Sequence, residues 1–85
     1  IYLSLDTLAK KAGEALDEKG RFYLVHRSDR LIDIVTTLRT YRLETRSIQF
    51  VYDENKKEAI SVLIEAIKDG KPNCHILKPI YKTRS

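Results

Sequence analysis

The chain has 85 residues, of which 42% are apolar and 33% charged, and it carries a net charge of +4 at pH 7. This length allows one domain at most, and so short a chain buries only about 60–65% of its unfolded surface. No apolar stretch is long enough to cross a bilayer, so we expect no membrane association. The modest positive charge permits contact with RNA but does not require it.

Two features indicate that the chain is part of a longer one. It contains no methionine, and it opens on apolar residues that lead directly into a predicted helix. Cys74 is the only cysteine, which excludes an internal disulfide. With no signal-peptide pattern at Ile1 to Asp6, this favours a cytoplasmic protein. One cysteine and two histidines are too few for a metal site, and Cys74 is expected to be inert.

Apolar residues at helical spacing predict a first helix from Leu5 to Glu18. Ser4 is the expected N-cap and Gly20 the expected C-terminal stop. Gly13 lies inside the helical pattern, where glycine costs about 1 kcal/mol relative to alanine. We therefore expect it to mark a close approach to a neighbouring strand.

The next run, Phe22 to Val25, is continuously apolar and predicts a strand buried on both faces, as in a parallel sheet covered by helices. A short turn, His26 to Ser28, follows. A second helix is predicted from Asp29 to Tyr41, with Ser28 or Asp29 as its cap.

Alternating residues predict a second strand from Ser47 to Tyr52, followed by a turn at Asp53 to Lys56. The segment Glu58 to Lys68 fits both a helix and a strand. A four-residue turn between two β-like runs favours a hairpin, so a strand is the prediction. A last extended segment, His75 to Tyr81, is interrupted by Pro79, which indicates an edge strand or a loop.

The predicted order is helix, strand, helix, strand, strand, with an extended basic tail at 73–85. The first three elements are part of a βαβ layering, and the final hairpin must be antiparallel. An antiparallel strand that ends an otherwise parallel sheet is the ending of class I methyltransferase sheets. We therefore predict an α/β fold that forms the C-terminal half of a Rossmann-like methyltransferase sheet, as one partial domain over residues 1–85.

The segment from Gly20 to Leu31, GRFYLVHRSDRL, resembles bacterial S-adenosylmethionine-dependent methyltransferases, above all the tRNA(Val) adenine-N6 methyltransferase family of "small-domain" methyltransferases. In those proteins a hydrophobic strand followed by VHR-x-x-RL comes after the catalytic strand and its helix. The resemblance continues through Tyr41–Glu44, Ile48–Val51 and Glu58–Pro72, and reaches about Pro79.

The resemblance implies an intact enzyme that uses S-adenosylmethionine to methylate the N6 amine of adenine in tRNA. The family's glycine-rich cofactor loop and its Asn-Pro-Pro-Tyr-type motif lie upstream in such proteins and are absent from this sequence. The only glycines here, Gly13, Gly20 and Gly70, are far apart. We therefore assign no catalytic, cofactor-binding or metal-binding residue to this chain. Its expected partners are the missing N-terminal half of the domain and tRNA, and an exposed strand edge would allow self-association.

Basic residues give the candidate RNA contacts. His26, Arg27 and Arg30 follow the first strand, at the edge of the sheet where α/β proteins bind ligands. The other candidates lie near the end of the second helix or in the tail: Arg39, Arg42, Arg46, Lys78 and Lys82, with Lys71 and Arg84 adding charge. Tyr23 and Tyr41 are expected in the core, which leaves Tyr2, Tyr52 and Tyr81 as aromatic side chains able to stack on bases.

Two other interpretations stay open. The chain can be a small free-standing module that binds nucleic acid or another protein, since its strands alternate and its tail is basic. It can also be an unrelated α/β domain that shares only the pattern.

Overall fold

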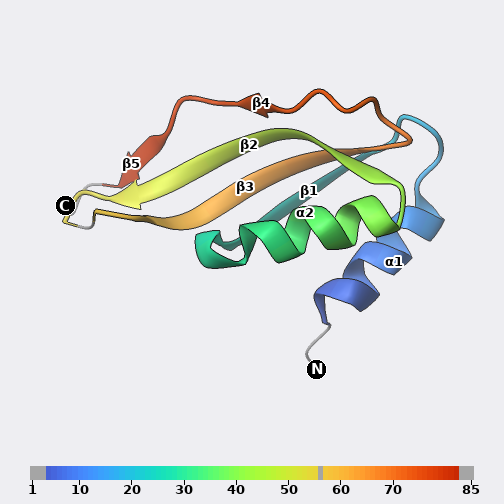
Figure 1. Cartoon of the computed structure of the whole chain (residues 1–85), viewed down its shortest axis with the longest axis horizontal. Coiled ribbons are helices and arrows are strands. Elements are labelled where there is room, and N and C mark those ends of the chain that lie inside the picture. The colour runs from blue at the N-terminus through green and yellow to red at the C-terminus, as the bar shows by residue number, and fades with distance from the viewer. Residues whose placement is uncertain (1–3, 56, 83–85) are drawn as a thin grey trace.

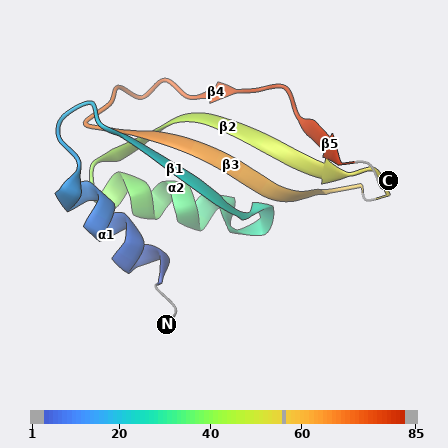
Figure 2. The same cartoon turned by 180° about the vertical axis from the view of Figure 1, so that it is seen from behind.

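The computed structural model describes residues 4–55 and 57–82. Within them the elements are, in chain order, α1 (Leu5–Ala15), β1 (Arg21–Arg27), the 3-10 turn η1 (Ser28–Arg30), α2 (Leu31–Thr40), β2 (Leu43–Asp53), β3 (Ala59–Lys68), β4 (His75–Ile76) and β5 (Ile80–Lys82). Both helices lie on the same face of one sheet (Figure 1). Figure 2, the view from behind, shows the tail with β4 and β5 running along β2.

The sheet has the strand order β1-β3-β2, and β3 is antiparallel to both neighbours. β1 and β2 therefore run parallel, with the last long strand inserted between them. Leu24 on β1, Ile64 on β3 and Ile48 on β2 lie in one row across the sheet. The predicted hairpin is confirmed, and so is the choice of strand for the ambiguous segment 58–68.

Burial along β3 explains why a strand forms there. Val62, Ile64 and Ala66 are buried against the helices, whereas Leu63 and Glu65 point to the other face. The buried core combines one residue of α1 with residues of α2, β2 and β3: Ala9, Ile34, Leu38, Leu43, Ile48, Val62, Ile64 and Ala66.

The first helix begins as predicted and ends early. Ser4 caps α1 by accepting a 3.1 Å hydrogen bond from the amide of Thr7. The predicted end at Glu18 and the predicted stop at Gly20 are wrong. Leu16 already leaves the helix with extended backbone angles, and Lys19, not Gly20, adopts a positive φ of 68° in the following turn.

Gly13 marks a close approach, although its neighbour is the end of α2 and not a strand. A Cβ atom at Gly13 would lie 2.8 Å from the carbonyl oxygen of Tyr41. The absence of a side chain therefore lets α1 pack against the C-terminus of α2.

The start of the second helix also differs from the prediction. His26 and Arg27 still belong to β1, so the predicted turn begins too early. Neither Ser28 nor Asp29 caps α2, whose N-cap is Arg30 without a side-chain hydrogen bond. The Ser28 hydroxyl donates instead to the carbonyl of Ala59, which ties the turn η1 to the start of β3.

One face of β1 is open, contrary to the prediction of burial on both faces. Phe22 and Leu24 pack against the core, but Tyr23 and Val25 are 68% and 65% exposed. The reason is that α1 and α2 both cover the other face. The prediction that Tyr23 lies in the core is therefore wrong for the described residues, whereas Tyr41 does pack against the core.

The tail follows the outer edge of β2 in two short pieces. β4 pairs with Ser47 and Ile48, and β5 pairs with Val51 to Asp53, both in parallel. Pro79 lies between them and interrupts the pairing, as predicted for an edge strand. No helix among residues 4–55 and 57–82 has the length and apolar character needed to cross a membrane.

Candidate nucleic-acid interface

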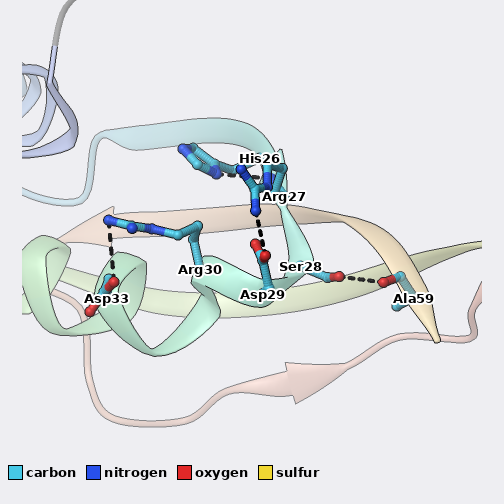
Figure 3. Close-up of polar contacts among 7 residues, drawn as sticks. All are labelled: His26, Arg27, Ser28, Asp29, Arg30, Asp33 and Ala59. Atoms are coloured by element: carbon cyan, nitrogen blue, oxygen red, sulfur yellow. Dashed lines mark hydrogen bonds and ion pairs between the residues drawn. The ribbon is translucent and has the colours of Figure 1, made fainter.

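The eight basic candidates do not form one site. The first group, His26, Arg27 and Arg30, lies at the carboxyl end of β1, where Figure 3 shows them beside Ser28 and Asp29. Arg39 and Arg42 lie at the opposite end of the sheet, where β2 begins, because α2 runs back along the sheet before β2 starts. The remaining three, Arg46, Lys78 and Lys82, lie along the outer edge formed by β2 and the tail.

The arginines at the carboxyl end of β1 are engaged by nearby acids. Arg27 contacts Asp29 at 2.5 Å, and Arg30 contacts Asp33 at 3.2 Å, one turn further along (Figure 3). The hydrogen bond from Arg27 lowers the pKa of Asp29, so this acid stays ionised and keeps the pair neutral as a whole. A phosphate would have to compete with a carboxylate for each of these two guanidinium groups.

His26 is half-buried on the helix side of β1, and its Nδ1 accepts a 2.8 Å hydrogen bond from the amide of Arg27. One ring nitrogen is thereby used to fix the local backbone. No carboxylate or nucleophile is bonded to the ring among the described residues. The arrangement indicates a structural role at the end of β1 and gives no support for base catalysis.

The arginines at the far end of the sheet are also paired. Arg39 makes a two-pronged contact with Glu44, at 2.6 and 3.3 Å. Arg42 contacts Asp69 at 2.6 Å and has a positive φ of 66° in the tight turn that starts β2. These pairs tie the connection from α2 to β2 and the end of β3 together.

Besides His26, three of the predicted candidates have no acidic partner among the described residues: Arg46, Lys78 and Lys82. Arg46 is the extra residue of a β-bulge in β2 and is exposed. The tail adds two exposed groups that the candidate set did not include, Lys71 and His75. Arg84, also expected to contribute charge, lies outside the described residues, as does Tyr2.

Aromatic side chains meet at the end of the same edge. Tyr52 of β2 and Tyr81 of β5 are register partners whose rings stack, with centroids 5.4 Å apart and planes inclined by 24°. Tyr81 is 63% exposed and Tyr52 is half-buried. Both had been predicted as available aromatics, but their mutual stacking depends on tail pairing that the sequence does not reveal.

The open face of the sheet holds a polar centre that sequence reasoning missed. Glu65 on β3 accepts hydrogen bonds from Arg21 at 2.7 Å, from Tyr23 at 3.1 Å and from Ser47 at 3.2 Å. Burial raises the pKa of Glu65, but the three donors outweigh it, so the pKa is lowered overall. The only sequence signal was a charged residue at the centre of an apolar strand.

A hollow of about 310 Å³ surrounds this centre. Its apolar lining includes Val25 on β1, Leu63 on β3 and Leu77 in the tail, and Gln49 on β2 also lines it. The open face is thus a shallow apolar trough with one ionised, satisfied carboxylate, not a cleft containing reactive groups.

Cys74 carries no sign of chemistry. Its thiol lies near Glu44, and both desolvation and that carboxylate raise its pKa, which lowers the fraction of reactive thiolate. Among the described residues no group of three or more His, Cys, Asp or Glu side chains is placed to hold a metal ion.

Comparison with known proteins identifies a similar fold but no matching family. No family model matches the chain, and no curated protein matches it. A solved structure does: the crystal structure of a predicted O-methyltransferase from Agrobacterium tumefaciens, with a TM-score of 0.79 and 17% sequence identity. The match covers 91% of this chain and 36% of that chain.

At this identity the likeness shows the fold alone. It confirms the predicted fold class, a mixed α/β arrangement in which an antiparallel strand lies between two parallel ones. The chain spans little more than a third of the matched protein's length.

Proposed function

We propose that this chain is the C-terminal part of an S-adenosylmethionine-dependent methyltransferase domain, and that the intact protein methylates the N6 amine of adenine in tRNA. The observation that carries the proposal is the position of β3, antiparallel between the parallel strands β1 and β2. The GRFYLVHRSDRL resemblance adds the adenine and tRNA specificity, which stands on sequence pattern alone.

The contrast between the two edges of the sheet supports a missing half. The outer edge of β2 carries short strands, Pro79 and lysines, which are devices that blunt an edge. β1 has none of them: it is a seven-residue strand in unbroken register with β3, without proline, glycine or bulge. In the proposed intact protein a further strand pairs with β1, and a further helix covers Tyr23 and Val25.

The described residues do not fit a cofactor site. Gly13 and Gly20 each lack room for a Cβ atom because backbone atoms lie 2.8 and 2.9 Å away, and Gly70 contacts Ile67. These glycines are enclosed by their own surroundings and leave no loop against which a nucleoside could lie. S-adenosylmethionine therefore belongs to the missing half, and the 85-residue chain alone is expected to be inactive. A cytoplasmic location is part of the same proposal.

The test compares this chain with the complete protein. Isothermal titration of S-adenosylmethionine into the 85-residue chain should give no binding heat. Tritiated S-adenosylmethionine with tRNA and stoichiometric chain should give no labelled RNA. The complete protein should label tRNA, and nucleoside analysis should place the methyl group on N6 of adenine. Methyl transfer by the short chain, or a complete protein that methylates only an oxygen, would refute the corresponding part.

A further inference from the structure

Several exposed basic side chains without an acidic partner among the described residues lie along one edge of the structure. We define the tail edge as five exposed basic side chains, one from β2 and four from the tail whose strands β4 and β5 pair with β2: Arg46, Lys71, His75, Lys78 and Lys82. No acidic residue occurs from Lys71 to Lys82. The tail edge therefore contrasts with Arg21, Arg27, Arg30, Arg39 and Arg42, each of which is held by an acid.

Because β4 and β5 pair in parallel with β2, basic residues of the tail are arranged in a row along this strand. His75 lies opposite Ser47, beside Arg46, and Lys82 lies opposite Asp53. At about 3.3 Å per residue, the stretch from Arg46 to Asp53 covers roughly 20 Å. A line of cations of this length can follow several phosphates of one extended strand. The adjacent acid Glu44 is taken up by Arg39, at 2.6 Å.

The line ends at an aromatic platform. Tyr81 is backed by Tyr52, which holds its ring in place, and the ring remains largely accessible. Stacking on such a ring suits any base, and a cationic track with aromatic stacking is the usual way to hold a single strand. A duplex offers its bases to an exposed ring only at its ends.

We infer that the tail edge binds single-stranded RNA, with the lysines on phosphates and Tyr81 stacked on a base. The choice of RNA rests on the proposed function, while the charge line and the platform stand independently of it. The same surface would guide the region next to the target adenine along the outer edge of the sheet. Arg27, Arg30, Arg39 and Arg42 take no part, because acids already hold them.

The experiment measures binding of a fluorescein-labelled single-stranded RNA to the 85-residue chain by anisotropy over a series of salt concentrations. The double variant Lys78→Gln/Lys82→Gln is compared with Lys10→Gln/Lys11→Gln, which removes the same charge from exposed positions on α1. Each single-strand phosphate contact contributes about 0.7 to the slope of log affinity against log salt. The tail variant should lower that slope by about 1.4, and the α1 variant should leave it unchanged.

Variants at the platform test stacking separately. Tyr81→Leu should weaken binding about tenfold, and Tyr81→Phe should retain it, since the ring and not the hydroxyl stacks. Circular dichroism spectra of the variants should match that of the unchanged chain, which would show that these exposed substitutions leave the fold intact.

The inference would be overturned if the tail and α1 variants lowered the salt slope equally, or if Tyr81→Leu left the affinity for RNA unchanged. It would also be overturned if polyglutamate or blunt duplex RNA bound as tightly as the single strand. Absence of RNA binding at low salt would also overturn it. Methyl transfer to tRNA by the complete protein could still occur in each of these cases, so the two proposals fail separately.

Discussion

Arg21 on β1 donates a 2.7 Å hydrogen bond to Glu65 on β3, diagonally across the paired strands, and so anchors the carboxylate that centres the open face. Tyr23 and Ser47 complete the contact, so side chains from all three long strands converge on one group. Because the side chain of Glu65 is only 18% exposed, this contact joins the strands in a partly desolvated setting.

Glu65→Gln is expected to destabilise the chain by about 1–2 kcal/mol at neutral pH, because hydrogen bonds to an ionised carboxylate are stronger than those to a neutral amide. The folded pKa of Glu65 is lowered, so its ionised form stabilises the fold above the unfolded pKa and loses this effect as pH falls through the folded pKa. Urea unfolding should therefore show the full difference at about pH 7 and a shrinking difference as the pH falls below the unfolded pKa of a glutamate and through the lowered folded one. A difference that does not change with pH would contradict the account, and Glu18→Gln at an exposed position serves as the control.

Gly13→Ala should destabilise the chain even though alanine favours helices. The added methyl would lie 2.8 Å from the Tyr41 carbonyl oxygen, which is backbone and cannot rotate away. We expect a loss of about 1–3 kcal/mol, against a gain of about 1 kcal/mol at an unobstructed helical site. Thermal unfolding of Gly13→Ala measures this directly, with Glu14→Ala on the exposed side of α1 as the comparison. A rise in the melting temperature would show that α1 does not pack against Tyr41.

Lys68→Met should loosen α1. Its ammonium group donates to the carbonyls of Gly13 and Leu16, where α1 has no basic residue of its own in its last turn. Losing these bonds and the favourable charge at a helix C-terminus should cost about 1–2 kcal/mol. Relative to the unchanged chain, Lys68→Met should accelerate amide hydrogen exchange in α1 more than in β3. Uniform acceleration over both elements would contradict the assigned contact.

Val25→Lys should reduce self-association of the isolated chain. Val25 and Tyr23 are exposed beside an unpaired strand edge, a combination that favours pairing with a second copy. A lysine there opposes edge pairing, while its effect on the free energy of unfolding should stay within about 0.5 kcal/mol. Sedimentation velocity over a concentration series should show a larger monomer fraction for Val25→Lys. Ile32→Lys, at a 73% exposed site on α2, should behave like the unchanged chain; equal effects of both would refute a role for the β1 edge.

Sequence periodicity predicted the elements well where burial is one-sided and local. The helix at Leu31–Thr40 and the hairpin of β2 and β3 follow from spacing and turn residues that act within a few positions. The ends of elements were less accessible. Gly20 was expected to end α1, but the helix ends earlier at Ala15, and Lys68, some fifty residues later, holds its last carbonyls.

The candidate site was predicted in composition but not in arrangement. Sequence cannot tell which arginines have an acid within reach, because the partners of Arg42 and Arg21 lie 27 and 44 residues away. The Tyr52–Tyr81 stack likewise requires the tail to return along β2. Tyr23 was placed in the core because an apolar run implies burial on both faces, whereas no element among the described residues covers the face on which Tyr23 lies.

The central claim, that this chain completes a methyltransferase domain begun elsewhere, is tested most directly by the mass of the native polypeptide together with the coding sequence upstream of Ile1. The account predicts a chain longer by roughly 150 residues, in line with typical domain sizes, that carries a glycine-rich loop and an Asn-Pro-Pro motif. A start codon immediately before Ile1, with a native mass equal to that of 85 residues, would contradict it and would favour the free-standing nucleic-acid-binding module.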